Sequence, residues 1–247
     1  MEPILSIKDL RRDFVVGAET VRALKGVSFD VFAGEFVSIM GTSGSGKSTL
    51  LNILGCLDRP TSGEYFIDGT PVARMSGDEQ SEIRSRKIGF VFQSYNLLAR
   101  TDALENVELP LLYNHNIPAK QRREMARHAL EQVGLADRMH HTPNQLSGGQ
   151  QQRVAIARAI VNNPVILLAD EATGNLDTRT SYEIMSLFQA LNEAGKTIAF
   201  VTHESDIAVF TKRTIMLRDG RIVKDSPVET RSAVESLEKM PKADDYQ

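Results

Sequence analysis

The sequence predicts an α/β fold in which helical segments alternate with the strands of a mostly parallel sheet. Three observations carry this prediction. Largely apolar runs at 35–40, 165–169 and 197–202 are typical of strands buried on both faces of a parallel sheet. Segments with helical spacing separate these runs along the chain. Polar residues follow directly where the strands end, which is where ligands bind in such sheets.

The first third of the chain has a second kind of strand pattern. Three segments alternate between apolar and polar residues, as in an antiparallel layer, and they lie at about 4–8, 27–31 and 64–67. Asp68 and Gly69 form a turn signal after the third segment. Ser76 and Glu79 have the spacing of a capping box, so a helix is expected to begin there.

A glycine-rich loop joins the strand at 35–40 to a segment with helical spacing. The loop matches G-x-x-x-x-G-K-[ST] and consists of Gly41, Thr42, Ser43, Gly44, Ser45, Gly46, Lys47 and Ser48, with Thr49 next in the helix. Its backbone N–H groups and the helix N-terminus favour phosphate oxygens. Lys47 is expected to reach the terminal phosphates, and the Ser48 hydroxyl is expected to bind Mg²⁺. The alternative is a glycine-rich turn with a solvated lysine, but the flanking strand and helix favour a P-loop NTPase.

Two acidic residues follow the apolar run at 165–169. At the carboxyl end of a parallel strand, Asp170 is expected beside the phosphate loop, where it would hold Mg²⁺ through water. Glu171 lies one residue further and would accept a proton from the attacking water. The alternative is a pair of solvated carboxylates that begin a turn.

Two other strands also end in a polar residue. His203 follows the run at 197–202 and is expected to face the terminal phosphate. Gln93 follows a strand at 87–92, and its amide oxygen suits Mg²⁺ or a water molecule. A single histidine or glutamine at a strand end is more often structural. Because three strand ends converge on one loop, each assignment supports the others.

Residues 94–162 are expected to form a helical subdomain inserted between the strands. Helices are predicted at 102–109, at 118–133 and from 148 to about 162. The core then resumes with a helix at 178–194, which Gly195 ends, and with a hairpin at 215–223.

The last helix of this subdomain begins with paired glycines. Ser147 is expected to be its N-cap, and Gly148 and Gly149 remove side chains from the first turn, so an anion can contact the N–H groups. Ser147 lies 100 residues beyond Lys47, which suggests that this anion is a phosphate bound by another subunit. An ordinary capped helix with flexible glycines is the alternative, and it leaves the glycine pair unexplained.

Together these motifs resemble the ATP-binding subunit of an ABC transporter. The phosphate loop, Gln93, LSGGQ at 146–150, the acidic pair at 170–171, GNLD at 174–177 and His203 occur in the order of that family. The resemblance covers about residues 4–225. It implies a RecA-like parallel sheet core at 1–93 and 164–226, with an N-terminal antiparallel β layer and an inserted α-helical subdomain at 94–163. A polar tail at 227–247 is expected to follow this ATP-binding domain at 1–226.

The resemblance implies that the ligands are ATP and Mg²⁺. Phe14 would stack on adenine, with a core aromatic as the alternative, and residues Gly41 to Thr49 would cradle the phosphates. Mg²⁺ would be held by Ser48 and Gln93, with Asp170 behind them. Catalysis would depend on Lys47, Gln93, Glu171 as the residue that polarises water, and His203 as the contact to the γ-phosphate.

The resemblance also implies that each site is completed by a second subunit. Ser147 and Gly149 would bind the partner's γ-phosphate, within a nucleotide-binding segment that includes Gly148 and Gln150. Asp177 would line the seam between subunits. Ala172 stands where proline is common in the family, so the loop that carries Asp177 is expected to be less rigid.

A closer resemblance is to the subgroup that serves macrolide export, lipoprotein release and the cell-division permease, on the stretches 92–98, 101–110 and 170–177. It implies a homodimer of ATP-binding subunits, a separate transmembrane permease and, as a further candidate partner, a periplasmic adaptor. Part of the segment 93–116 is expected to form a cleft for a permease helix, through Tyr95, Leu97, Leu98, Leu111, Leu112 and Tyr113. The alternative is that all of these residues pack inside the subdomain.

Composition narrows the class of protein. The net charge of −3 gives no electrostatic case for nucleic acid, and a single cysteine, Cys56, excludes an intrachain disulfide. No signal peptide and no run of 18 apolar residues is present, so the channel is expected in another chain and this chain at the cytoplasmic face of the membrane. Two alternatives remain: a soluble ATPase of the same family acting on DNA or ribosomes, and a subunit that transmits force without moving a solute.

Overall fold

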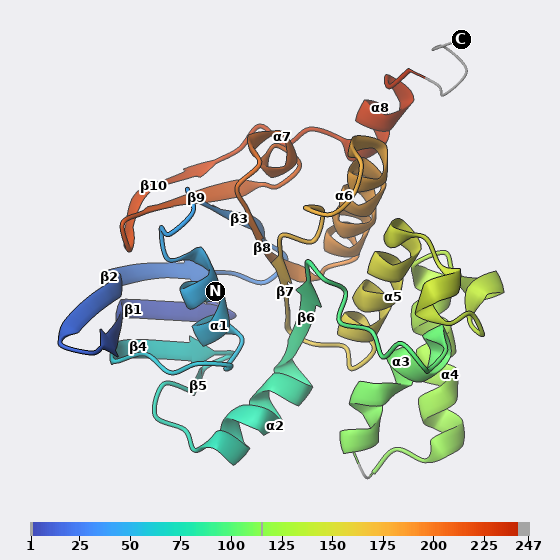
Figure 1. The fold of residues 1–247 in the computed structure, drawn as a ribbon, viewed down its shortest axis with the longest axis horizontal. Coiled ribbons are helices and arrows are strands. Elements are labelled where there is room, and N and C mark those ends of the chain that lie inside the picture. The colour runs from blue at the N-terminus through green and yellow to red at the C-terminus, as the bar shows by residue number, and fades with distance from the viewer. Residues whose placement is uncertain (1, 115, 242–247) are drawn as a thin grey trace.

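The computed structural model describes residues 2–114 and 116–241, which form two sheets flanked by helices (Figure 1). The strand orders are β10-β9-β3-β8-β7-β6 in the larger sheet and β2-β1-β4-β5 in the smaller. The larger sheet contains β3 (Phe36–Met40), β6 (Ile88–Phe92), β7 (Ile166–Asp170), β8 (Thr197–Thr202), β9 (Arg213–Arg218) and β10 (Arg221–Pro227). The smaller contains β1 (Leu5–Val16), β2 (Glu19–Val31), β4 (Ser62–Ile67) and β5 (Thr70–Pro71).

The larger sheet is the predicted parallel core. Strands β3, β6, β7, β8 and β9 pair in parallel, and β10 joins β9 as an antiparallel hairpin. Every residue of β3 and β8 is buried, as the continuous apolar runs require. Parallel pairing brings the carboxyl ends of β3, β6, β7 and β8 to one edge of the sheet. The predicted site residues follow these strands at that edge.

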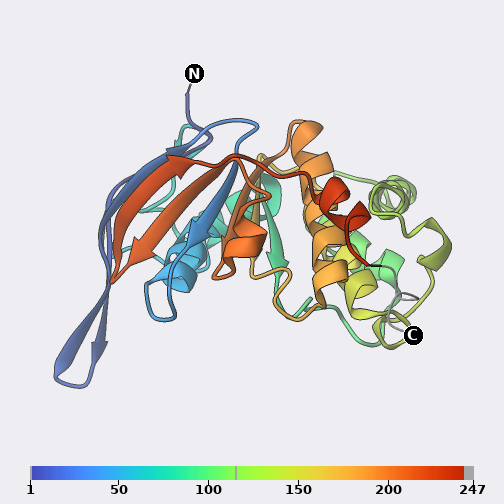
Figure 2. The same ribbon diagram turned by 90° about the horizontal axis from the view of Figure 1, so that it is seen from above.

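The predicted antiparallel layer is present, but its first two strands are longer than expected. The alternation at 4–8 and 27–31 marks only the inner ends of β1 and β2, whose pairing continues to Val16 and Glu19. In the outer part most side chains are exposed, so no hydrophobic alternation marks these residues as a strand. The two strands form a hairpin that extends beyond the rest of the layer (Figure 2).

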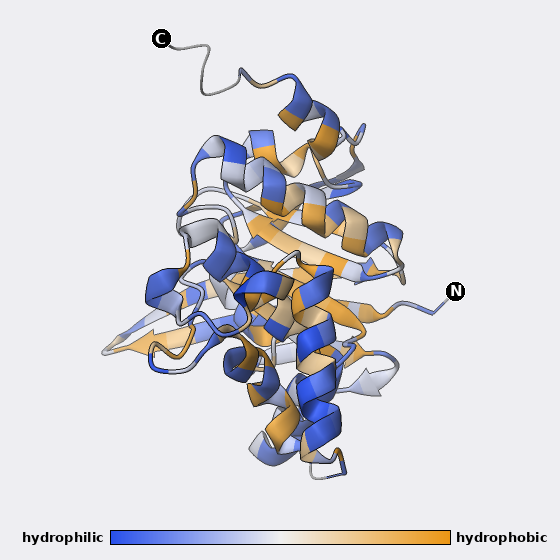
Figure 3. Cartoon of the chain, turned by 90° about the vertical axis from the view of Figure 1, so that its right-hand side faces the viewer, coloured by the Kyte–Doolittle hydropathy of each residue, from blue (hydrophilic) through white to orange (hydrophobic). Residues whose placement is uncertain are grey.

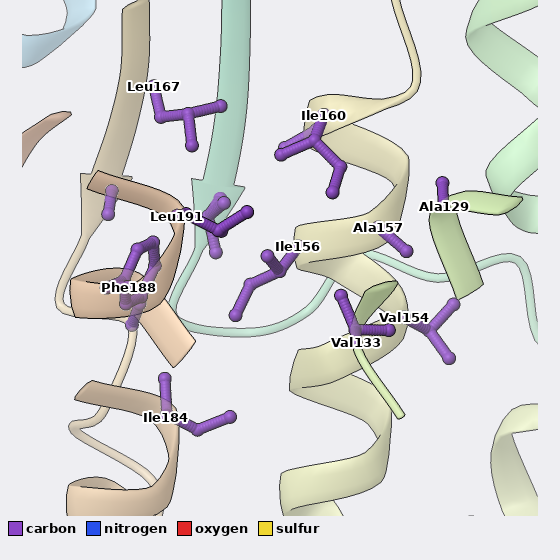
Figure 4. Packing of buried hydrophobic residues seen from close by; sticks show 14 of the residues in the cluster. Ala129, Val133, Val154, Ile156, Ala157, Ile160, Leu167, Ile184, Phe188 and Leu191 are labelled. Atoms are coloured by element: carbon purple, nitrogen blue, oxygen red, sulfur yellow. The ribbon is translucent and has the colours of Figure 1, made fainter. Parts of the chain in front are cut away.

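The inserted residues form the predicted group of helices. They are α3 (Ala103–Glu108), η1 (Leu109–Tyr113), α4 (Ala119–Gln132), η2 (Ala136–Arg138), η3 (Pro143–Gln145) and α5 (Gly148–Ile160). Helix α5 joins this group to the core: Ile156 points toward Ile184 and Phe188 of α6 (Thr178–Glu193), whereas Val154 lies on the side of Val133 (Figure 4).

Two apolar clusters cover opposite faces of the parallel sheet. One contains α5, α6 and the inserted helices, and the other contains α1 (Lys47–Leu54) and the antiparallel layer. Helices α2 (Gly77–Lys87) and α7 (Ser205–Ala208) complete the periphery, and Ser76 and Glu79 form the predicted capping box of α2. Figure 3 shows the apolar strands at the centre of the molecule, with helices of mixed polarity around them.

The residues after Pro227 differ from the expected polar tail. They include α8 (Ala233–Glu238), which packs on α6. The Gln189 side chain donates to Arg231 O and accepts from Ala233 N, and Ala233 is fully buried. Because a single alanine and one glutamine anchor this helix, the apolar pattern in the sequence is too sparse to reveal it. Residues 242–247 of the predicted tail lie outside the described residues.

Within the described part of the chain, we find no helix that is both long enough and apolar enough to span a lipid bilayer.

Candidate active site

The phosphate loop runs from the end of β3 into α1, as the motif predicts. Gly46 is the N-cap of α1, with φ of 103°. A Cβ atom at this position would lie 2.7 Å from the carbonyl oxygen of Ala23 in β2. Glycine is therefore required twice, by the left-handed backbone and by the close approach of a neighbouring strand.

Lys47 and Ser45 are buried within this loop. The Lys47 Nζ atom donates hydrogen bonds to Gly41 O (2.8 Å) and Thr42 O (3.1 Å). The Ser45 hydroxyl is buried and has no hydrogen-bond partner among residues 2–114 and 116–241. A buried hydroxyl of this kind needs an acceptor or donor, which a phosphate oxygen would supply.

The loop forms the floor of a cavity of about 860 Å³. Its wall brings together residues that the sequence predicted separately: phosphate-loop residues, Glu171 and His203. It also includes residues of β2 and β9 that the motifs did not indicate. The cavity is lined by Val21, Arg22, Ala23, Met40, Gly41, Thr42, Ser43, Gly44, Gly46, Lys47, Ser48, Thr49, Glu171, His203 and Met216.

Glu171 and His203 are paired at the edge of the parallel sheet. The His203 Nδ1 atom lies 2.9 Å from Glu171 Oε1, and the two residues follow β7 and β8. Glu171 has a left-handed backbone with φ of 44°, and its N–H donates to Val201 O at 2.9 Å. The interpretation of Glu171 as a carboxylate simply beginning a solvated turn does not account for this pairing.

Asp170 is the last residue of β7 and is partly buried. Burial raises the pKa of its carboxyl, the negative charge of Glu171 raises it further, and the nearby ammonium of Lys47 lowers it in part. A divalent cation bound beside Asp170 would offset both the burial of its carboxyl and the negative charge of Glu171.

Gln93 lies beside the segment that follows Glu171, not in the wall of the cavity. Its backbone carbonyl accepts from Asn175 Nδ2 at 3.2 Å. A Cβ atom on Gly174 would lie 2.7 Å from Gln93 Nε2, so glycine lets the two segments approach closely. Gln93 is thus positioned by the loop that carries the predicted base.

The LSGGQ segment lies outside this cavity. Ser147 is exposed and is the N-cap of α5, in a capping box with Gln150, as the sequence predicts for the cap. The paired glycines also have a packing role: Cβ atoms there would approach Thr180 Cγ2 (2.5 Å from Gly149) and Tyr95 Oη (3.0 Å from Gly148). The packing of α5 against its neighbours therefore accounts for part of the glycine requirement.

Phe14 and Asp177 are both accessible at the surface. Phe14 is 36% exposed, so the interpretation of this residue as a core aromatic is wrong. It pairs across the hairpin with Val21, which lines the cavity. Asp177 is the N-cap of α6, where Thr180 N and Oγ1 donate to its carboxylate and lower its pKa.

Two arginines that no sequence motif indicates organise the surroundings of the site. Arg158 of α5 donates to the carbonyl oxygens of Tyr95 and Asn96, just after Gln93. Arg12 of β1 forms a two-pronged ion pair with Asp58 and covers the ring of Phe14. Neither arginine lies in a recognisable motif. The only sequence signal for Arg158 is that it stands among the apolar residues of the second half of α5, where an arginine needs a partner.

Comparison with known proteins gives a consistent result. The model of the ABC transporter family matches residues 24–174. An uncharacterized ABC transporter ATP-binding protein of Thermotoga maritima is 57% identical over 222 residues, which cover 90% of this chain and 94% of that protein. The macrolide export ATP-binding/permease protein MacB of Chlorobium phaeobacteroides is 53% identical over 91% of this chain, which corresponds to 34% of MacB. The dimeric post-hydrolysis structure of the ATP-binding cassette MJ0796, bound to ADP and Pi, superimposes with a TM-score of 0.83 at 48% identity, covering 92% of this chain and 100% of that one.

Proposed function

Since the chain belongs to the ABC transporter family, it is an ATPase subunit of a membrane transporter, and we propose that it acts as a homodimer that binds two ATP molecules and drives a separate permease. The family confirms the resemblance drawn from the motifs. The observation that carries the proposal is the Glu171–His203 pair in the wall of the cavity that the phosphate loop lines. Hydrolysis of a phosphoanhydride needs a carboxylate near water and a cradle for the phosphates, and both occur here.

In this proposal the nucleotide phosphates are held by residues 41–49. The backbone N–H groups of the loop and the N-terminus of α1 provide the cradle, and Lys47 contacts the β- and γ-phosphates. Glu171 accepts a proton from water, while the ring of His203 both holds the carboxylate of Glu171 and contacts the γ-phosphate.

The side chains present also suit Mg²⁺. Ser48, Gln93 and Asp170 would hold the ion, since a hydroxyl, an amide oxygen and a carboxylate are ligands that Mg²⁺ accepts beside substrate phosphates. The raised pKa of Asp170 supports this assignment, because a cation would offset both the burial of this carboxyl and the repulsion from Glu171. The ion would neutralise the charge on the phosphates when bound.

The second half of each ATP site would come from the partner subunit. Ser147 is exposed at the start of α5, and none of Ser147, Gly148, Gly149 and Gln150 lines the cavity of their own chain, which supports a role in trans. Asp177, exposed at the start of α6, would line the seam between the two subunits. An isologous pair places the two cavities in equivalent positions.

The permease would dock beside the inserted helices. Leu98, Leu112 and Tyr113 are 48%, 47% and 73% exposed, whereas Leu111 is fully buried. The interpretation that the whole set packs inside the subdomain is therefore wrong. Tyr113 also borders a cavity of about 820 Å³ between α2 and η1, which supports a docking site for a short permease helix.

Several finer points belong to the same proposal. The chain would lie at the cytoplasmic face of the membrane, and its permease would engage a periplasmic adaptor. The transporter would serve export, lipoprotein release or the transmission of force, and the relatives that contain this domain include export proteins, which supports the first of these. A soluble ATPase acting on DNA or ribosomes is not favoured for the same reason. We also propose that the domain divides into a core at 1–93 and 164–226 and a subdomain at 94–163. The reason is that α5 packs against the inserted helices on one side and against α6 of the core on the other.

The test of the proposal is nucleotide-dependent dimerisation. With ATP and Mg²⁺, the Glu171→Gln variant is expected to accumulate as a dimer in light scattering, because hydrolysis stops and the repulsion between carboxylate and γ-phosphate is removed. Adding Ser147→Arg to the same chain should return it to a monomer, since the arginine would collide with the partner's nucleotide. If both proteins stay monomeric, or both dimerise equally, the composite site is refuted.

The permease surface is tested separately. Tyr113→Ala should weaken co-purification with the permease encoded beside the gene while ATP binding stays unchanged. Lys120→Ala, an exposed change on the neighbouring helix, is the matched control. Undiminished assembly of Tyr113→Ala, Leu98→Ala and Leu112→Ala would place the permease elsewhere.

A further inference from the structure

Phe14 is held by a stacked arginine at the base of the exposed hairpin. The Arg12 Cζ atom lies 4.4 Å from the centroid of the Phe14 ring, which is the geometry of a cation–π contact. The guanidinium covers one side of the ring, and Phe14 as a whole residue remains 36% exposed. Beyond Phe14 the hairpin is open to solvent, with Val15 and Val16 exposed by 78% and 64%.

The guanidinium of Arg12 is itself fixed by Asp58. Arg12 Nε donates to Asp58 Oδ2 and Nη2 donates to Asp58 Oδ1, both at 2.8 Å. Both side chains are about three-quarters buried, being 24% and 27% exposed. A two-pronged, partly buried pair fixes orientation far better than a single contact between exposed side chains.

Asp58 connects this pair to the phosphate loop. It follows α1, the helix that Lys47 begins, and its backbone N–H donates to Asn52 O in that helix at 3.1 Å. The Asp58 carboxylate also accepts from Arg59 N at 2.7 Å, and this second contact helps to fix its orientation. A continuous series of contacts therefore joins the phosphate cradle to the ring of Phe14.

We propose that Arg12 is a positioning residue for the nucleotide base: with Asp58 it fixes the ring of Phe14, covers one face and leaves the other to stack on adenine. The proposal rests on the proposed function, in which Phe14 stacks on the base of ATP. Val21, the cross-strand partner of Phe14, lines the phosphate cavity, so Phe14 lies next to the cavity wall without being part of it. A ring fixed in advance loses less conformational freedom when the base binds.

The experiment compares a ligand that has a base with one that lacks it. ADP and inorganic pyrophosphate, each with Mg²⁺, are titrated calorimetrically into the full-length chain, so that hydrolysis does not interfere. The variants are Arg12→Ala, Asp58→Asn, Phe14→Ala and the double variant Arg12→Ala/Phe14→Ala. Arg11→Ala is the matched control, because Arg11 is the neighbouring residue of β1, 47% exposed, and its ion pair is with Asp9.

Arg12→Ala is expected to raise the Kd for ADP about 2- to 12-fold, which corresponds to ordering one side chain on binding, and to leave the Kd for pyrophosphate unchanged. Asp58→Asn should shift the ADP Kd in the same direction by less, since one hydrogen bond to Arg12 can remain. Arg12→Lys, which keeps the cation but not the fork, should fall between wild type and Arg12→Ala. The double variant should match Phe14→Ala, because Arg12 acts only through the ring.

Each other outcome overturns a defined part of the argument. If Phe14→Ala weakens ADP but Arg12→Ala does not, Arg12 has no positioning role. If Arg12→Ala weakens ADP and pyrophosphate equally, the ion pair supports the phosphate loop, not the ring. If Phe14→Ala itself leaves ADP unchanged, the stacking role of Phe14 is lost and the inference with it, while the dimer test above is unaffected. Should Arg12→Ala fail to fold, Arg12→Lys and Asp58→Asn decide the question.

Discussion

Replacement of Arg158 tests whether α5 holds the loop that follows Gln93. The Arg158 guanidinium donates to Tyr95 O at 2.7 Å and to Asn96 O at 2.6 Å. Tyr95 and Asn96 both have left-handed backbones, with φ of 58° and 51°. Consecutive non-glycine residues in this conformation persist only where their surroundings hold them. Arg158→Met removes both donors and the charge but keeps most of the side-chain volume.

The expected loss of stability follows from these contacts. A hydrogen bond to a charged group contributes about 1.5–3 kcal/mol, so two such bonds set an upper range of about 3–6 kcal/mol. Two effects reduce this value. Burial lowers the pKa of Arg158, so methionine removes an unfavourable buried charge, and Asn96 is exposed, so its carbonyl can bond to water instead. A net loss of about 2 kcal/mol corresponds to a fall in Tm of about 4–8 °C for a domain of this size.

The assay is thermal unfolding of the full chain, followed by circular dichroism. Arg127→Met, a change on the exposed face of α4, is the control and should leave Tm almost unchanged. Arg158→Lys should recover part of the loss, because the ammonium keeps the charge and can donate to a carbonyl but lacks the planar fork of the guanidinium. A Tm for Arg158→Met equal to that of the control would refute the reasoning, since the two hydrogen bonds would then contribute nothing.

Three further predictions concern the site and its surroundings. Glu171→Gln should retain ATP binding but lose turnover by about 10²–10⁴-fold, as expected when a general base is removed; near-normal steady-state hydrolysis would exclude Glu171 from that role. A mixture of Ser147→Arg and Lys47→Ala chains should hydrolyse ATP faster than either variant alone, because the mixed dimer keeps one intact composite site; rates no higher than the parents would count against it. Cys56 should resist thiol reagents at pH 8 until the protein unfolds, since burial raises its pKa to about 11 and leaves little thiolate, and rapid labelling of the native protein would contradict this.

The parts of the fold that the sequence predicted are those set by burial and by local hydrogen bonding. Continuous apolar runs identified the parallel strands, because both faces of β3 and β8 are covered. Capping residues such as Ser76 and Ser147 identified helix starts, because their side chains bond within a few residues. The convergence of Glu171 and His203 followed from parallel pairing alone.

The parts that were missed depend on contacts between distant segments. The outer half of the β1–β2 hairpin has no apolar alternation, and α8 is anchored by a glutamine from α6. Arg158 and Arg12 look like solvated charges in the sequence, because their partners are backbone carbonyls 62 and 63 residues away and a carboxylate 46 residues away. The packing role of Gly149 could not be seen either, since Thr180 approaches it from another helix.

At Glu171 the backbone conformation lowers the stability of the fold, whereas the side chain serves the proposed chemistry. A left-handed φ of 44° at a residue other than glycine costs about 1–2 kcal/mol. Glycine would relieve that strain but would also remove the contact with His203, so Glu171→Gly is expected to melt close to the wild type although it lacks the proposed base. Selection for stability alone would therefore not maintain this carboxylate. Its retention would reflect selection for turnover, and a screen for thermostable variants of this chain would be expected to tolerate inactive ones at this position.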